Sequence, residues 1–168
     1  MLGLDGKFSQ ILVDNLPGPR GLNVIWGLHF IPGPWIDGIA ISKGTGSVTN
    51  GYESITGQIN VAMRNPENAE PLYINVYASS DGSTEWNHVS NHKINRKWST
   101  VLLSHAAKAS QLNDRNLDSF LDTPLKRDIV LRNEWKYRGD RGIIGEYSIT
   151  GNRMNHMAGQ KAVFDSSS

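Results

Sequence analysis

The sequence predicts a mainly β protein with a small α+β part. Turn-forming residues are frequent, including 17 glycines among the 168 residues. They separate short segments in which apolar and polar residues alternate, as they do in half-buried strands. Helical periodicity is nearly absent: one short helical segment is predicted within Gly21–Trp35, where Gly27 interrupts it and Pro32 and Pro34 end it.

The first part of the chain, residues 1–65, combines this short helical segment with three predicted strands. A turn-rich segment, Asn15–Pro19, follows the first strand. The polar segment 66–71 shows no alternation and is predicted to be a linker, so the chain divides into residues 1–65 and residues 72–168. The three predicted strands are Phe8–Asp14, Gly38–Ser42 and Gly57–Met63.

The second part is predicted to be a run of about five antiparallel strands, longer than those before the linker. Short turns at Asn95–Lys97 and Gly139–Gly142 alternate with a long connection, Ser110–Asp128. The predicted strands are Leu72–Ser79, Thr84–Ile94, Trp98–Ala109, Ile129–Arg138 and a fifth that begins at Ile143 and fades beyond Thr150.

These strands fit two kinds of sheet. Strands of about ten residues with short turns at one end suit a transmembrane β-barrel. An antiparallel sheet with one wet face gives the same alternation, and the pattern alone favours it because barrel signals are weak in each segment. In a barrel, Ile129, Leu131, Trp135 and Tyr137 would face lipid, and Arg132, Glu134 and Lys136 would face the lumen. Interfacial girdles would come from Trp86, Trp98, Trp135, Tyr73, Tyr77, Tyr137 and Tyr147.

Four ordered segments of the first part carry a family resemblance: Phe8–Pro17, Leu28–Asp37, Gly38–Gly51 and Ile55–Val61. Together they resemble the C-terminal half of the plug domain of TonB-dependent receptors. Asn15, Thr45 and Asn50 depart from the family pattern, where Gly, Pro and Tyr are usual. The positions that match the plug motifs are Asp14, Pro32, Lys43, Gly44, Gly46, Ser47, Gly51, Gly57 and Asn60.

The resemblance implies half of a plug domain in residues 1–65 and the first strands of an incomplete outer-membrane β-barrel in residues 72–168. The second part resembles the first barrel strands of such receptors, especially those of Bacteroidetes-like bacteria. Such receptors import a scarce nutrient (a siderophore, vitamin, metal complex or glycan) across the outer membrane of a Gram-negative bacterium. The expected partners are outer-membrane lipid, a small-molecule or oligosaccharide ligand and, for the full-length receptor, the TonB complex.

The chain is therefore expected to be a fragment. It lacks the family's signal sequence, its TonB-binding segment, the first half of the plug and most barrel strands. The ligand side is expected near residues 40–56 and 110–128. The alternative is a soluble β-rich ligand- or carbohydrate-binding module, stabilised by calcium.

The long connection contains oxygen-bearing side chains at alternate positions, as a calcium loop does. Asp114, Asn116, Asp118, Asp122 and the carbonyl group of Phe120 would be the ligands. Ser119 replaces the turn glycine of an EF-hand loop, and Leu125 replaces its bidentate glutamate. The chain is expected to require no cofactor, and the pattern leaves open either a calcium site or a solvated acidic surface loop.

Several other functions are disfavoured. The 17 basic and 16 acidic residues nearly cancel, so nucleic acid is not an expected partner, and the absence of cysteine removes thiolate chemistry. The Lys43–Ser47 segment lacks the ending of a phosphate-binding loop. His88 and His92 would lie ~13 Å apart on a strand, too far to share a metal ion. No catalytic constellation is evident, so we expect no enzyme.

Overall fold

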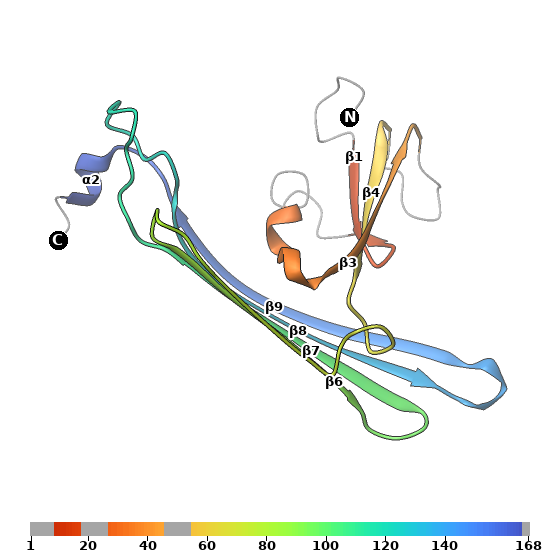
Figure 1. Cartoon of the computed structure of the whole chain (residues 1–168). Helices are drawn as coiled ribbons and strands as arrows, with labels where there is room; N and C mark the ends of the chain where they lie inside the picture. The colour runs from red at the N-terminus through yellow and green to blue at the C-terminus, as the bar shows by residue number, and fades with distance from the viewer. Residues whose placement is uncertain (1–8, 18–26, 46–54, 166–168) are drawn as a thin grey trace. The chain divides into compact units, whose positions relative to one another are not determined.

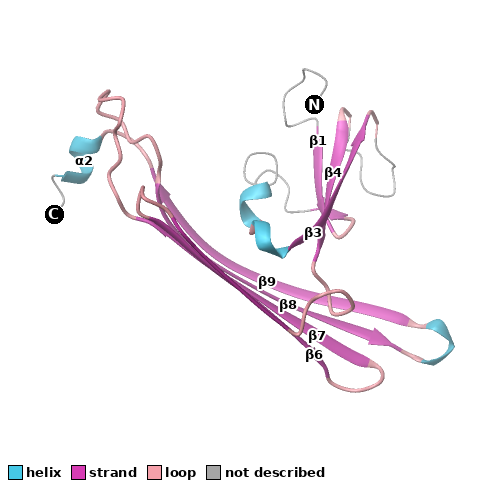
Figure 2. Cartoon of the chain, in the orientation of Figure 1, coloured by secondary structure: helices cyan, strands magenta, loops and turns pink. Residues whose placement is uncertain are grey.

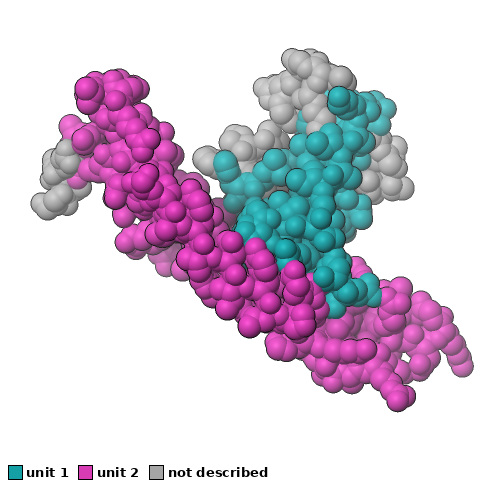
Figure 3. Space-filling model, viewed as in Figure 1, with its two compact units in different colours: residues 1–68 teal, residues 69–168 magenta. Residues whose placement is uncertain are grey.

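The computed structural model describes residues 9–17, 27–45 and 55–165, and within them the chain is mainly β, as predicted. The strands form one sheet of four strands and one of five. The chain divides into two compact units, unit 1 (Met1–Asn68) and unit 2 (Ala69–Ser168), which Figure 3 distinguishes by colour. This boundary falls inside the 66–71 segment.

Unit 1 contains a mixed sheet. The parallel pairing of β1 with β4 joins segments far apart in the chain, and β3 pairs antiparallel with the other side of β4. Two short 3-10 turns precede β3 (Figure 2). In spatial order the strands are β2 (Leu16–Pro17), β1 (Ser9–Val13), β4 (Gly57–Met63) and β3 (Ile36–Lys43), and the turns are η2 (Gly27–Phe30) and η3 (Gly33–Trp35).

The apolar core of unit 1 explains why these short strands hold together. Leu12 of β1 and Val61 of β4 are almost fully buried, and so is the Trp35 ring at the end of η3. Pro32 and Pro34 limit the predicted helical segment to 3-10 turns in its described part, because proline cannot continue an α-helix. The rest of that predicted segment, and Phe8, lie outside the described residues.

Unit 2 is an antiparallel meander in which each strand pairs with the next one in sequence (Figure 1). A five-residue helix, α2, lies near its C-terminal end. No helix among the described residues is long and apolar enough to cross a membrane. The elements are β5 (Leu72–Ala78), β6 (Ser83–Lys93), β7 (Trp98–Ala109), β8 (Leu125–Arg138), η5 (Asp140–Gly142), β9 (Ile144–Met157) and α2 (Lys161–Asp165).

The last two strands are longer than the sequence predicts. β8 starts at Leu125 rather than Ile129, and β9 continues to Met157 rather than fading after Thr150. The added residues pair with each other, as Lys126 does with His156. Their side chains are mostly polar and show no apolar alternation, so the pattern that marks the other strands is missing from these ends.

One end of the sheet in unit 2 has two short turns, and the other has the short β5–β6 turn, residues 79–82, and one long connection. β6–β7 and β8–β9 are joined by short turns at one end, and the long β7–β8 connection lies at the other (Figure 1). The Asn95 side chain fixes the first short turn, because its Oδ1 atom accepts hydrogen bonds from the backbone N–H groups of Lys97 and Trp98 at 2.8 and 2.9 Å. In the second, Arg141 adopts a positive φ of 63°.

Candidate functional site

One face of the β5–β9 sheet carries most of its exposed apolar side chains, and polar residues of β6 and β7, such as His88 and Ser104, lie among them. The register places Ile74, Leu131 and Gly151 in one row across the sheet, with their side-chain positions on the same side. About half of the Leu131 side chain is exposed, at 50%, and 59% of Ile149. We call this surface the apolar face; it includes Leu72, Ile74, Val76, Trp86, Leu102, Ile129, Leu131, Trp135, Tyr147 and Ile149.

Aromatic rings gather on the apolar face at the end with the short turns. The Trp98 ring lies 6.3 Å from the Trp135 ring in an edge-on arrangement and 4.9 Å from the Tyr137 ring, measured between centroids. With Ile94 and Tyr147, the two tryptophans line a surface hollow of about 510 Å³. Tryptophan and tyrosine combine an apolar ring with a polar edge, which suits the boundary between an apolar phase and water.

The opposite face of the sheet is polar, yet many of its side chains are buried. Asp128 is only 3% exposed and Glu134 6%, whereas Ile129 and Leu131 of the same strand are 49% and 50% exposed. An antiparallel sheet of a water-soluble protein normally buries its apolar face and hydrates its polar one. We call this surface the polar face; its members include Asn75, Glu85, Asn87, His105, Lys126, Asp128, Arg132 and Glu134, and among them lie the buried Val89, Val101, Leu103 and Val130.

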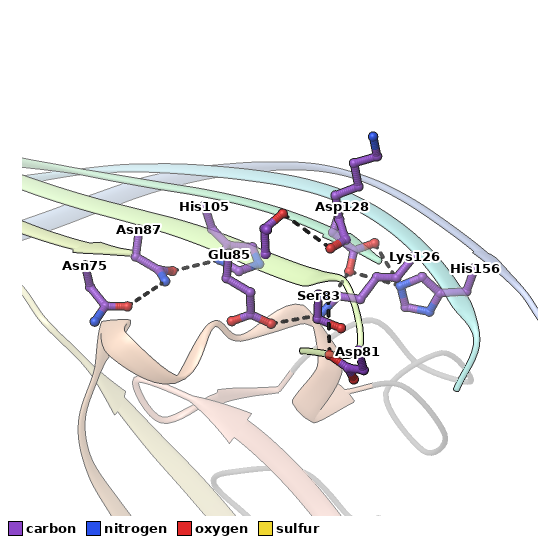
Figure 4. Close-up of polar contacts among 11 residues, drawn as sticks. Asn75, Asp81, Ser83, Glu85, Asn87, His105, Lys126, Asp128 and His156 are labelled. Carbon is purple, nitrogen blue, oxygen red and sulfur yellow. Dashed lines mark hydrogen bonds and ion pairs between the residues drawn. The ribbon is translucent and has the colours of Figure 1, made fainter. Parts of the chain in front are cut away.

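A chain of hydrogen bonds crosses three strands on the polar face (Figure 4). The Asn87 amide donates to Asn75 Oδ1 at 3.3 Å, and its own Oδ1 lies 2.7 Å from His105 Nδ1. Because an amide oxygen only accepts, His105 Nδ1 is the donor in this contact. Asn87 is fully buried, so these bonds replace the water that its amide group would otherwise require.

Charged side chains continue this network toward the end with the long connection (Figure 4). Asp128 accepts from His156 Nε2, which lies 2.8 and 3.0 Å from its two oxygens. Lys126 Nζ lies 3.7 Å from Asp128 and 3.2 Å from Glu85. Farther along β8, Arg132 pairs with Glu134 at 3.0 Å. The polar face therefore holds paired charges, a surface suited to contact with polar groups.

The sequence pattern predicted only part of this network. Arg132, Glu134 and Lys136 do share one face of β8, opposite Leu131. The pattern does not predict that His105 meets Asn87 or that His156 meets Asp128, because each pair is brought together only by the strand register. Lys126 and Asp128 stand at alternate positions before Val130, and this spacing could have indicated that β8 begins earlier and carries both charges on one face.

The loop predicted to bind calcium folds largely on its own hydrogen bonds. Backbone N–H groups of Arg115, Ser119 and Phe120 donate to Asp122, Asp114 and Asp118 at 2.7, 3.2 and 2.8 Å. Asn116 and Asp118 also bond to each other. Within the described ranges, no three His, Asp or Glu side chains gather closely enough to hold a metal ion. The calcium site stays a prediction.

The plug-motif residues in the described ranges have clear structural positions. Asp14 and Asn15 adopt positive φ angles of 51° and 65° in the turn between β1 and β2. Asp14 Oδ1 accepts from the Met63 amide at 2.9 Å, and the side chains of Asn15 and Asn60 are joined at 2.8 Å. This turn thus ties β1 to β4, which explains the polar residues there.

The remaining motif residues surround the β3–β4 connection or precede β3. Gly44 and Gly57 have φ angles of 97° and 152°, in the region that favours glycine. Lys43 ends β3, and Pro32 is buried before η3. Gly46, Ser47 and Gly51 lie outside the described residues.

Asp81 stabilises the β5–β6 turn by accepting hydrogen bonds from Ser79 and Ser83, and titration of its carboxyl group tests these contacts. The Ser79 hydroxyl, followed by the Ser83 amide, donates to this carboxylate and holds the pKa of Asp81 below its ordinary value of 3.8. The ionised form therefore stabilises the turn fully above about pH 3.8, and this contribution disappears as the pH falls through the lower folded value. NMR titration of the carboxyl carbon should show the Ser79→Ala variant returning toward 3.8, with Ser80→Ala unchanged. Superimposable curves for Ser79→Ala and wild type would contradict the assignment.

Comparison with other proteins gives no match that bears on the family resemblance. No family model matches the chain, and no curated protein matches it either.

Proposed function

We propose that this chain is part of a TonB-dependent outer-membrane receptor that imports a scarce nutrient. The observation that carries the proposal is the reversed polarity of the β5–β9 sheet, whose apolar face is exposed while charged side chains on the other face are buried. A sheet that contacts lipid on one side and a polar interior on the other requires this arrangement. An exposed apolar surface of this extent is otherwise a liability in water.

The strand lengths support the same proposal. β6 to β9 contain 11, 12, 14 and 14 residues. A tilted strand needs about 9–11 residues to cross the hydrocarbon layer, so all four are long enough. Among the described residues, β5 and β9 each pair on one side only, and lipid would require a further neighbour for each. We propose that these are consecutive strands of a larger transmembrane barrel.

For unit 1, the proposal is the second half of a plug domain. Its support is the ordered set of motif segments and the role of Asp14, Asn15 and Asn60 in joining β1 to β4. The complete receptor would obtain energy from the TonB complex and would bind a siderophore, vitamin, metal complex or glycan. Residues 40–56 and 110–128 are the proposed ligand-side segments.

Quenching of tryptophan emission by brominated lipid tests the lipid contact. The whole chain is purified with detergent and transferred to vesicles whose acyl chains carry bromine. Strong quenching is expected because Trp86, Trp98 and Trp135 lie on the apolar face. Replacing these three by phenylalanine should remove most of the quenching, whereas Trp35→Phe, at a buried position of unit 1, should not. A monodisperse, cooperatively folding chain in plain buffer, unaffected by vesicles, would overturn the proposal.

The alternative is a soluble carbohydrate- or ligand-binding module, and one observation favours it. The hollow lined by Trp98, Trp135 and Tyr147 presents rings on which a sugar could stack. Calcium would then have a structural role: Asp114 Oδ1 is buried and has no hydrogen-bond partner within the described part of the chain. If the chain folds in plain buffer, a terbium luminescence titration of the loop is the next measurement.

A further inference from the structure

Three cations lie together at one end of the apolar face. Lys108 of β7 stands directly opposite Arg127 of β8, and Arg153 of β9 stands opposite Ile129, the next position of β8 on the same side. All three side chains are exposed. We call them the basic cluster. They lie at the end of the sheet from which the long β7–β8 connection leaves (Figure 1).

The basic cluster lacks the counter-charges that other cations of the sheet possess. On the polar face, Lys126, Arg132 and Lys136 each lie within 4 Å of a carboxylate oxygen. No such ion pair, and no side-chain hydrogen bond, is made by Lys108, Arg127 or Arg153 to any described residue. Like charges directly opposite each other on neighbouring strands are destabilising. An anion bound between them would remove this cost.

A hollow at the same place has the composition of a site for an amphiphile. It has a volume of about 250 Å³, and its charged lining comes from two members of the basic cluster, Lys108 and Arg127, and from Lys126, which is ion-paired on the polar face. Asn155 adds a polar amide, whereas Leu125 and Met157 add apolar surface. Lysine and arginine together bind phosphate oxygens well, arginine as a planar fork and lysine as a point charge. The hollow therefore offers a phosphate site bordered by apolar side chains.

The surroundings identify the source of the phosphate. Ile129, 49% exposed, follows the cluster along β8, and the apolar face continues from there through Leu131. A free phosphate ion would make no favourable contact with this adjoining apolar surface, whereas the acyl chains of a lipid would pack against it. Resting on the proposed function, we propose that the basic cluster binds the phosphate of an anionic lipid headgroup whose acyl chains lie along the apolar face.

Trp86 provides a local reporter for this site. It lies on the apolar face two positions along β6 from Thr84, the residue opposite Lys108. A Trp98→Phe, Trp135→Phe background leaves Trp86 as the tryptophan of this face. The whole chain is placed in mixed vesicles of phosphatidylglycerol and phosphatidylcholine, with bromine on only one of the two lipids at a time.

The expected result is a selective quenching of Trp86. Brominated phosphatidylglycerol should be enriched about fivefold or more around Trp86, which is roughly what one cation contributes near a membrane surface. The enrichment should disappear when Lys108, Arg127 and Arg153 are all changed to glutamine. Changing Lys93, Arg96 and Arg141 to glutamine removes the same charge at the other end of the sheet and should leave it intact.

Two different failures can be distinguished. If neither brominated lipid quenches Trp86, the chain does not enter the bilayer, and the proposed function fails with the inference. If both lipids quench equally, the chain contacts lipid without preference, and only the inference is overturned. It is also overturned if inorganic phosphate abolishes the selectivity, because the cluster would then be a site for the free ion.

Discussion

Replacing Leu131 by lysine should prevent the β5–β9 sheet from assembling in a membrane. Leu131 lies near the middle of β8, opposite Ser104 and Gly151, and half of its side chain is exposed on the apolar face. A lysine at the bilayer midplane costs about 2–4 kcal/mol in a transmembrane barrel. The test expresses the full polypeptide encoded by the gene. It measures the fraction that is inserted and protease-resistant in outer-membrane preparations.

A matched lysine near the end of the sheet provides the control. His92→Lys introduces the same side chain on the same face, beside the β6–β7 turn and opposite the uncharged Thr100. Near the interface its cost should be only about 0–1 kcal/mol, so assembly should remain close to wild type. If Leu131→Lys assembles as well as His92→Lys, the apolar face does not contact lipid. In a soluble sheet the same change would improve solubility.

Replacing Asp128 by alanine should lower the free energy of unfolding of unit 2. The loss should exceed that from removing any other single charged side chain of the polar face near the long connection. The carboxylate is 3% exposed and accepts from His156, with Lys126 at 3.7 Å. A hydrogen bond to a charged group contributes about 1.5–3 kcal/mol, and the loss should be of this size because the side chains left behind, Lys126 and His156, are 34% and 27% exposed and can reach water. The free energy of unfolding, from denaturant titration followed by tryptophan emission in one fixed detergent or buffer, measures the loss.

Two variants separate burial from charge. Asp140 forms an ion pair with Lys97 but is largely exposed, so Asp140→Ala should cost only about 0–1 kcal/mol. Asp128→Asn keeps an acceptor for His156 and should fall between the two alanine variants. Equal, small losses for Asp128→Ala and Asp140→Ala would mean that the Asp128 contacts contribute nothing to the stability of the sheet.

The main features of the fold follow from local sequence patterns. The alternation in Leu72–Ala78 and in Ile129–Arg138 predicts strands because adjacent side chains of a strand point to opposite faces. Turn residues such as Asn95 predict where strands end. The start of β8 and the end of β9 escape this reasoning, because Leu125–Asp128 and Gly151–Met157 are held by pairing with each other.

The polar network depends on information that no local pattern contains. Asn87 and His105 meet because β6 and β7 pair in one particular register, and a shift by one residue would turn His105 to the other face. The burial of Asp128 likewise depends on the whole sheet. The sequence does indicate which residues of β8 share a face, but it does not indicate which face is buried.

The order of the strands in unit 2 has a consequence for how the chain acquires its structure. Every strand pairs with its neighbour in sequence, so β8 and β9 meet after closing only a short turn. In unit 1, β1 can pair with β4 only after a long loop closes, since Gln10 and Gln58 are separated by 48 residues. Loop-closure entropy makes local pairings faster than distant ones. The hairpins of unit 2 therefore form early and can be added one after another, whereas the sheet of unit 1 closes late.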